Sequence, residues 1–474
     1  MSFSTLLFLL IILPNSLLAD RLAPARLRNP VLLFLSLFFY WYSGGKGICF
    51  LAWICVWSWM TAQLIGRSET PGKRKGWTAL SISVEIAVLA FFKYAGIIWP
   101  VLCAVTGTDE KVLPVSPPGI SFITFAAIAY EVDVFRGSKA EKNPFDVALP
   151  LSFFPLVISG PIVRHGVLAD QFRTRQRTLD DLADGFLRFC KGLCLKVLIA
   201  GPLGEAAVYV FDNPLSSGFS APVWWFGLFA YAMQLYFDFS SYSDMAIGIS
   251  RMFGIRIPEN FRDPYLAVTG SDFWRRWHIS LSEWFRDYAY IPLGGSRKGD
   301  PATVRNLLAV WLLTGIWHGA GWTFVLWGTL WWLVLVLERF RIRPETRNGM
   351  LRRSYSWMIR LFAVLDFGIF RCADLPGVLL MFRRLFGPAA WTAGSESPMA
   401  LSLILGNYGL YLVIALILAL GLPGMWFGKI WEKITKRSPV FAEVLRLAFL
   451  GMLMILAVSS VVDSGYDPFL YAMF

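Results

Sequence analysis

Residues 312–328 read LLTGIWHGAGWTFVLWG and lie inside an apolar run that extends from residue 304 to residue 337. A transmembrane helix needs roughly 20 predominantly apolar residues, so this run is long enough for two passes or for a broken helix. The glycines between Gly315 and Gly321 predict the position of the break. Because His318 is an ionisable residue within a membrane segment, it is a candidate for function.

The composition of the whole chain points to a membrane protein. Of its 474 residues, 56% are AVILMFWYC and 16% are charged, whereas soluble domains have about 25% charged residues. This excludes a single water-soluble domain and a disordered or fibrous chain. We expect an all-α polytopic membrane protein with about 11–13 membrane-embedded helices. The apolar runs lie near residues 4–19, 29–43, 47–65, 78–103, 118–135, 145–161, 185–211, 221–250, 304–337, 356–371, 400–421 and 443–461.

The first apolar run has some features of a signal peptide. It lacks a basic segment at its start, and Leu17 stands where a small residue would precede a cleavage site. We therefore interpret it as a retained first helix.

The net charge of +12 predicts topology rather than nucleic-acid binding. The basic residues gather in residues 67–75, 338–353 and 429–437, between apolar runs. Loops rich in Lys and Arg stay on the cytoplasmic side, so we place these three loops there.

Residues 251–305 combine charged residues with Trp and Tyr. Such a segment cannot span lipid, yet it is too aromatic for a plain solvated loop. We expect interfacial or re-entrant helices packed into a funnel lined by protein.

The chain contains three histidines, and each has its own sequence context. Around His318, Gly315 and Gly321 flank the imidazole if the segment is helical, which predicts a cleft open to substrate; the alternative is a core histidine. His278 is either functional or an interfacial residue that anchors an Arg/Trp-rich helix. His165 is interpreted as a loop residue near the interface.

Polar residues in the run near 221–250 form a further candidate group. Asp238, Ser241 and Tyr242 share one helical face, either lining a cavity or bonding helices together. The six cysteines are interpreted as buried apolar residues, and no metal site is expected.

Two long motifs, FWRRWHISLSEWFRDYAYIPLGG at residues 273–295 and the stretch at residues 312–328, are the most specific in the chain. Through them the sequence resembles the membrane-bound O-acyltransferase superfamily, and within it the bacterial alginate O-acetylase branch. The resemblance covers nearly the full length, and it is weaker before about residue 115 and over residues 340–460. Shorter matching stretches lie at residues 121–125, 160–164, 237–249, 258–261 and 468–471.

The resemblance implies one integral-membrane domain over residues 1–474, with N-terminal helices to residue 115, a motif core over 116–340 and C-terminal helices from 341. It implies transfer of an acetyl group from cytoplasmic acetyl-CoA across a bacterial inner membrane to an exported polysaccharide. The first expected acceptor is an alginate-like exopolysaccharide, and the next are peptidoglycan and cellulose. No bound cofactor is expected, and a periplasmic SGNH-like transferase is the expected partner. D-alanyl transfer to teichoic acid is the alternative within the family.

The resemblance also assigns roles to matched residues. His318 corresponds to the family's intramembrane histidine and would act as general base, while His278 would orient it, bind the donor or protonate the leaving thiolate. Ser241 and His165 depart from the branch, which usually has Gly and an aromatic residue there. Candidates for the donor phosphates are Arg275, Arg276, Arg297 and Lys298, and those for the cavity lining are Asp238, Tyr242, Asn260, Trp317 and Trp322.

A hypothesis from another class is a transporter, flippase or scaffold of a polysaccharide export complex that makes no bonds. The sequence has no visible internal repeat, which disfavours a transporter built from paired halves.

Overall fold

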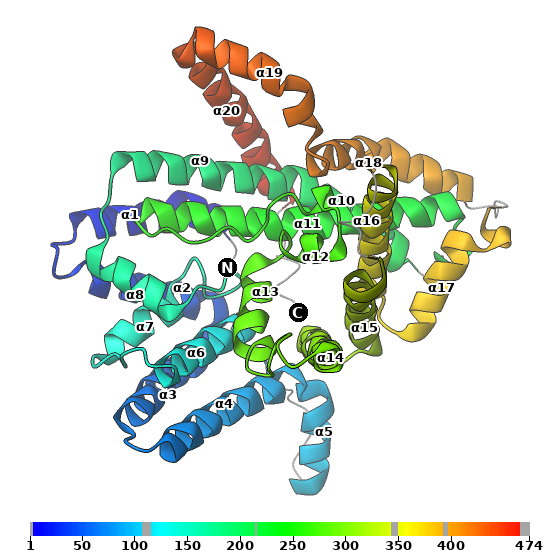
Figure 1. The fold of residues 1–474 in the computed structure, drawn as a ribbon. Helices are drawn as coiled ribbons and strands as arrows, with labels where there is room; N and C mark the ends of the chain where they lie inside the picture. The colour runs from blue at the N-terminus through cyan, green and yellow to red at the C-terminus, as the bar shows by residue number, and fades with distance from the viewer. Residues whose placement is uncertain (1–2, 107–114, 214–215, 343–348, 392–396, 465–474) are drawn as a thin grey trace.

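The computed structural model describes residues 3–106, 115–213, 216–342, 349–391 and 397–464. Over these residues the chain is helical and contains no strand (Figure 1). Within the described residues, six helical stretches are long and apolar enough to cross a membrane, so this is an all-α polytopic membrane protein. They are Arg28–Arg67, Pro71–Lys93, Leu179–Phe211, Trp322–Ile342, Pro398–Ala419 and Pro439–Val462.

The fold is organised around one long central helix, α11 (Ala221–Met252). Nearly all of its residues are buried, and it lies alongside α9 (Leu179–Leu195) (Figure 1). The two helices approach closely at Gly192, which has no side chain. A Cβ at this position would lie only 2.7 Å from the Ser241 carbonyl oxygen. Small residues at such a contact let two backbones meet, which is a common way for membrane helices to pack.

A buried ion pair also joins these helices. A π-helical turn, Lys196–Ala200, follows α9 and leads to α10 (Gly201–Phe211). Its Lys196 Nζ lies 2.5 Å from Asp238 Oδ1, and the Lys196 side chain is 1% exposed. Asp238 therefore bonds two helices, which is one of the two roles considered for it.

The N-terminal helices pack mainly on one another, with α3 in contact with both α4 and α6. The first apolar run forms a π turn, Phe8–Ile12, and a helix, which confirms its helical character. The run near 78–103 is not one helix, because the chain breaks at Tyr94. The helices are α1 (Leu13–Leu22), α2 (Arg28–Gly44), α3 (Ile48–Arg67), α4 (Pro71–Lys93), α5 (Ala95–Thr106) and α6 (Ile120–Phe135).

The expectation of an apolar helix near residues 145–161 is wrong. Helix α7 (Pro144–Ser152) has nine residues, and an irregular segment follows it as far as α8 (His165–Thr174). Pro155 lacks a backbone N–H and disfavours helical backbone in the residue before it. The irregular segment is buried among helices, as irregular backbone at membrane depth must be.

The aromatic segment 251–305 contains short helices packed inside the protein, as expected. They are α12 (Gly270–Trp274) and α13 (Ile279–Phe285), followed by a π turn, Arg286–Tyr290. Phe273 stacks on Trp277 and on Trp331, with ring centroids 5.7 and 5.4 Å apart. Aromatic packing therefore fixes this charged segment against its neighbours.

The long run at 304–337 is broken as predicted, into α14 (Asp300–His318) and α15 (Trp322–Leu337). The C-terminal third adds α16 (Gly349–Arg371), α17 (Leu375–Phe386), α18 (Ser397–Ala419), α19 (Leu422–Arg437) and α20 (Pro439–Ser464). Helices α17 and α19 were not among the predicted runs because basic residues interrupt their apolar faces.

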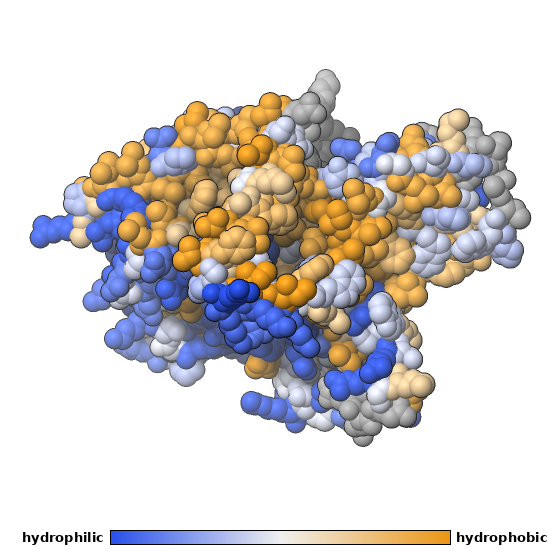
Figure 2. Space-filling model, turned by 90° about the horizontal axis from the view of Figure 1, so that it is seen from above, coloured by the Kyte–Doolittle hydropathy of each residue, from blue (hydrophilic) through white to orange (hydrophobic). Residues whose placement is uncertain are grey.

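Large apolar side chains are exposed on the C-terminal helices, for example Phe449 and Ile455 on α20. Figure 2 shows a broad apolar area on one face, with polar side chains gathered along one side. Such a surface suits contact with lipid.

Of the cysteines, Cys49 is exposed, which corrects the expectation that all six are buried. The matched stretch 468–471 lies outside the described residues.

A candidate active site around two histidines

His318 is the last residue of α14 and is 6% exposed. Its imidazole is surrounded by aromatic rings: the centroids of Trp317, Trp327 and Phe370 lie 4.5, 5.0 and 5.0 Å from its own. These rings come from three helices, α14, α15 and α16. His318 therefore stands in an apolar enclosure, where a neutral imidazole is favoured over a charged one.

The cleft predicted beside His318 is not present. Because α14 ends at His318, Gly321 does not share its helix. A Cβ on Gly315 would lie 2.5 Å from the Phe324 carbonyl oxygen, and one on Gly319 would lie 2.3 Å from the Phe324 ring. These glycines therefore let α15 pack tightly against α14 instead of leaving room for substrate.

His278 precedes α13 and is 1% exposed. Its backbone is left-handed, with φ 45° and ψ 54°, and it is one of two non-glycine residues with positive φ among those described. Such a conformation is costly for a residue with a side chain and persists where the surroundings enforce it. The left-handed backbone therefore indicates that the surrounding residues hold His278 in a fixed conformation.

Asn260 fixes the ring of His278. Its Oδ1 lies 3.2 Å from His278 Nδ1 and also accepts hydrogen bonds from the backbone N–H and hydroxyl of Ser280, while its Nδ2 donates to Ser243 Oγ. Because this amide orientation leaves Oδ1 as acceptor, His278 Nδ1 is the donor. The neutral ring then carries its lone pair on Nε2.

The structure brings the two predicted histidines together. The rings of Phe122 and Trp317 lie between them: Phe122 is 6.3 Å from His278 and 6.4 Å from Trp317, centroid to centroid. Trp317 in turn packs against His318, with ring centroids 4.5 Å apart. Two motifs that are separate in sequence thus meet in one buried cluster.

A third ionisable residue, Lys93, joins this cluster and was missed by the sequence analysis. It ends α4, and its Nζ lies 5.0 Å from the centroid of the Trp317 ring. The next residue, Tyr94, donates from its hydroxyl to the Ile316 carbonyl, which ties α4 to α14. The signal was present in the sequence, since Lys93 interrupts the apolar run 78–103 as His318 interrupts 304–337.

The other predicted site residues divide among the cluster, other parts of the core and the surface. Asn260 and Trp317 belong to the cluster, whereas Trp322 is 72% exposed and Tyr242 stacks on Phe3. Arg276 Nε lies 2.9 Å from Asp272 Oδ1 within one helical turn. The remaining basic candidates, Arg275, Arg297 and Lys298, are exposed.

An ion cluster anchors the π turn that follows α13. Asp287 accepts hydrogen bonds from Arg286 and Arg164, and the Arg136 guanidinium donates to the Asp287 carbonyl oxygen. Burial alone would raise the pKa of Asp287, but the two guanidiniums outweigh it and hold that pKa below its ordinary value. The cluster fastens the His278 segment to α6 and to the irregular segment near residue 160.

His165 is not a loop residue, which corrects the sequence interpretation. It begins α8, is 4% exposed, and packs on Tyr130 with ring centroids 4.2 Å apart. Its Nε2 lies 3.1 Å from the Asp146 carbonyl oxygen. Burial lowers the pKa of His165 to about 4, so it is neutral at physiological pH. It takes the place of a packed aromatic side chain.

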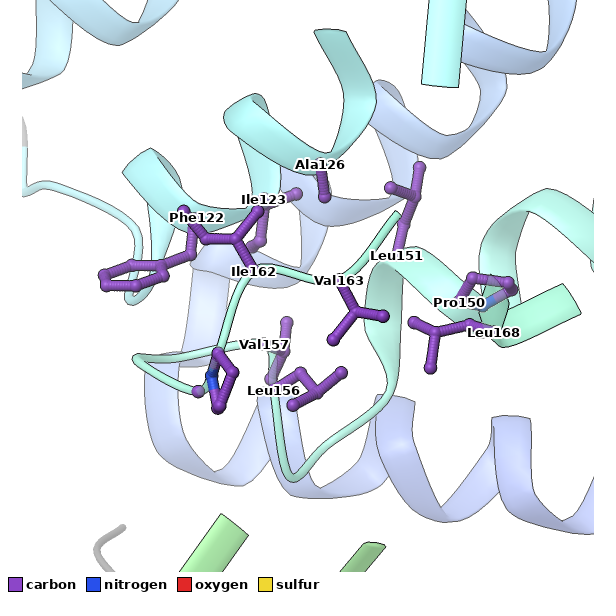
Figure 3. Close-up of a pocket in the computed structure, with 12 residues that line it drawn as sticks. Phe122, Ile123, Ala126, Pro150, Leu151, Leu156, Val157, Ile162, Val163 and Leu168 are labelled. Carbon is purple, nitrogen blue, oxygen red and sulfur yellow. The ribbon is translucent and has the colours of Figure 1, made fainter. Parts of the chain in front are cut away.

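A small apolar cavity lies beside Phe122, between α6, α7 and the irregular segment (Figure 3). Its volume is about 20 Å³, and side chains such as Ile123, Leu151 and Val157 line it. That volume could hold one water, but the side chains that line it are all apolar and give a water no hydrogen-bond partner. We interpret it as a gap in the core and not as a substrate site.

Comparison with known proteins places this arrangement in a family. The model of the membrane-bound O-acyltransferase family matches residues 35–382, which include both histidines. This chain belongs to the membrane-bound O-acyltransferase family. It is therefore an O-acyltransferase, and the histidine cluster lies within the part of the chain that defines the family.

Relatives resemble the chain over most of its length. It is 35% identical to the probable alginate O-acetylase AlgI of Pseudomonas putida, with the whole of both chains aligned. It is 39% identical to the protein of the same name in Azotobacter vinelandii, over 83% of this chain and 79% of that one. The peptidoglycan O-acetyltransferase of Helicobacter pylori is 33% identical, over 81% of this chain and 80% of its own.

Proposed function

We propose that this O-acyltransferase moves an acetyl group from cytoplasmic acetyl-CoA across the membrane for O-acetylation of an exported polysaccharide. The names of its relatives support an acetyl group and a glycan acceptor, with an alginate-like polymer first and peptidoglycan or cellulose next. The observation that carries the proposal is the meeting of His318 and His278 in one buried cluster.

In the proposed reaction His318 is the general base. Neutral His318 removes the proton of the acceptor hydroxyl as the hydroxyl oxygen attacks the thioester carbonyl carbon. The C–S bond of the tetrahedral intermediate then breaks, and the coenzyme A thiolate takes up the proton. Base catalysis of this kind typically contributes about 10²–10⁴-fold to a rate.

His278 and Lys93 complete the chemistry in this proposal. With Nδ1 committed to Asn260, His278 presents Nε2, which can accept and return a proton during departure of the thiolate. The ammonium of Lys93, near Trp317, favours the negative charge that develops on the carbonyl oxygen. His278 is 1% exposed and lies where water is excluded, and there electrostatic effects are stronger than in water.

The proposal also includes contacts for the donor phosphates, a partner protein and a location in the cell. The donor phosphates would contact exposed basic residues among Arg275, Arg276, Arg297 and Lys298. A periplasmic SGNH-like transferase would complete the transfer, and the protein would lie in the bacterial inner membrane. Membership of an enzyme family favours acyl transfer over the transporter and scaffold hypotheses.

Complementation tests the proposal in cells. The chain is expressed in an alginate-producing strain that lacks its own O-acetylase, and the acetyl content of the secreted polymer is measured by NMR. We expect acetylation to return with the wild-type chain and not with His318→Ala at equal membrane abundance. Alginate without acetyl groups, together with new base-labile acetate on peptidoglycan, would move the acceptor to peptidoglycan. Acetate on neither polymer, with the wild-type chain present in the membrane, would contradict the proposal.

A further inference from the structure

A pocket of about 350 Å³ opens at the N-terminal half of α16, away from the histidine cluster. Ser356 Oγ donates to the Ala267 carbonyl oxygen at 2.8 Å, which ties α16 to the chain that leads into α12. The volume is within the range of small-molecule sites, roughly 300–1,000 Å³. The pocket is lined by Val268, Gly349, Arg352, Arg353, Ser356, Trp357 and Arg360.

The pocket is lined by three arginines. Arg352, Arg353 and Arg360 form no ion pair with a carboxylate among the described residues, in contrast to Arg175 and Arg188, which pair with acids. Three guanidiniums on one wall repel one another, so an anion between them would be stabilising.

Arg360 stacks on an aromatic side chain and has one buried donor without a partner. Its guanidinium carbon lies 4.6 Å from the centroid of the Trp357 ring, and its Nε is buried without a hydrogen-bond partner. A buried donor of this kind is costly unless a partner arrives. The stack on Trp357 fixes the plane of the guanidinium while leaving its edge able to donate.

Glu338, an acid bonded to Tyr355 of α16, forms no ion pair with these arginines. Glu338 Oε1 accepts from the Gly270 N–H and the Tyr355 hydroxyl, and Oε2 accepts from the Ser271 N–H and hydroxyl. All of these donors are neutral. The Glu338 carboxylate is therefore committed to the start of α12 and is not available to the arginines.

We propose that this pocket binds the phosphate group of an organic phosphate at the cytoplasmic side of the membrane. Guanidinium forks match phosphate oxygens in pairs, and Trp357 adds an aromatic surface. Two sources share this chemistry: the phosphodiester of an anionic lipid and the phosphates of coenzyme A. The second source rests on the proposed function, and it would add Arg352, Arg353 and Arg360 to the basic residues that contact the donor. Arg360 and Phe370 lie ten residues apart on α16, which corresponds to about 15 Å of helix. Phe370 contacts His318.

Direct binding to the purified full-length protein tests the proposal without acetyl transfer. The variant Arg352→Gln/Arg353→Gln/Arg360→Gln is compared with wild type and with Arg383→Gln/Arg384→Gln, which removes two arginines of α17 outside this pocket. Binding of coenzyme A, which carries no acetyl group, is measured by calorimetry in phosphatidylcholine nanodiscs. Retention of phosphatidylglycerol is measured by native mass spectrometry.

We expect the pocket variant to weaken binding of at least one probe by about tenfold or more, and the α17 variant to leave both unchanged. Loss of coenzyme A binding alone identifies the donor, and loss of phosphatidylglycerol alone identifies the lipid. Arg360→Lys, which keeps the charge but not the fork, should weaken the same probe to a smaller extent, which separates phosphate recognition from misfolding. Unchanged binding of both probes in the pocket variant would overturn the proposal.

Discussion

The ammonium of Lys93 lies 5.0 Å from the centroid of the Trp317 indole ring, and Trp317 in turn packs edge-on against His318. A cation at the end of α4 thus reaches the same buried cluster as the histidine at the end of α14. The position of this charge links the N-terminal helices to the reaction proposed for the family motifs.

The first prediction concerns that charge. Lys93→Met should lower kcat by about 10²-fold, because it removes a positive charge near the oxygen on which negative charge develops. Lys93→Arg should retain part of the activity. Turnover of labelled acetyl-CoA provides the measurement, and Lys429→Met, at an exposed position on α19, is the control. Full activity of Lys93→Met would remove this residue from the mechanism.

A second prediction concerns the tautomer of His278. Asn260→Ala should reduce kcat by about 10²-fold or more, since the ring is then free to place its proton on either nitrogen. Asn260→Asp keeps an acceptor opposite Nδ1 and should recover much of the rate, with a shifted pH profile. If Ala and Asp were equally active across the pH range, Asn260 would have only a packing role.

A third prediction tests the contact between α14 and α15. In Gly315→Ala the new Cβ would meet the Phe324 carbonyl oxygen at 2.5 Å, so the helices must separate. We expect a loss of about 1–3 kcal/mol in stability and, because His318 moves with its helix, a fall of about 10²-fold in activity. Gly406→Ala on α18, where a Cβ meets nothing within 4 Å, should leave activity unchanged. Equal Tm and activity for the two variants would refute the packing argument.

A fourth prediction follows from the pKa of His165, which falls from an ordinary 6.5 to about 4 on burial. Between these pH values the unfolded chain binds more protons than the folded one, so the free energy of unfolding decreases as pH falls through this window and is constant above it. The loss at His165 is on the order of 3 kcal/mol.

His165→Phe removes that dependence and supplies the aromatic side chain that packing on Tyr130 favours. Thermal unfolding in detergent between pH 7 and pH 4 should therefore show a smaller decrease in Tm for the variant. The difference between the two proteins is informative because all other titrating groups are shared. Parallel Tm profiles would show that His165 does not titrate with unfolding.

Much of the site could be predicted from the sequence, because intramembrane ionisable residues are rare and costly. That reasoning found His318 and, through its motif, His278. It missed Lys93 because basic residues were considered only where they gather between apolar runs, and Lys93 lies inside the run 78–103. It was wrong about Gly315, since a missing side chain can mean either an open cleft or a close helix contact, and only the packing of Phe324 decides between them.

The fold shows the same division. Most long apolar runs predicted helices correctly. The run at residues 145–161 failed, because Pro155 and tertiary packing give an irregular segment, and the run at residues 78–103 is interrupted at Tyr94. Amphipathic α17 and α19 carry too many basic residues for a hydropathy pattern to reveal them. Pairing of Lys196 with Asp238 depends on contacts between helices, which a single sequence does not contain.

The most direct test of the central claim is the turnover of acetyl-CoA labelled in its acetyl group by the purified full-length protein, wild type against His318→Gln. We predict that the wild type transfers the label to a hydroxyl acceptor or releases it as acetate. His318→Gln should do so at least about 10²-fold more slowly, with unchanged Tm and elution volume. A His318→Gln protein that turns over the labelled donor at the wild-type rate would contradict the assignment of His318 as the base.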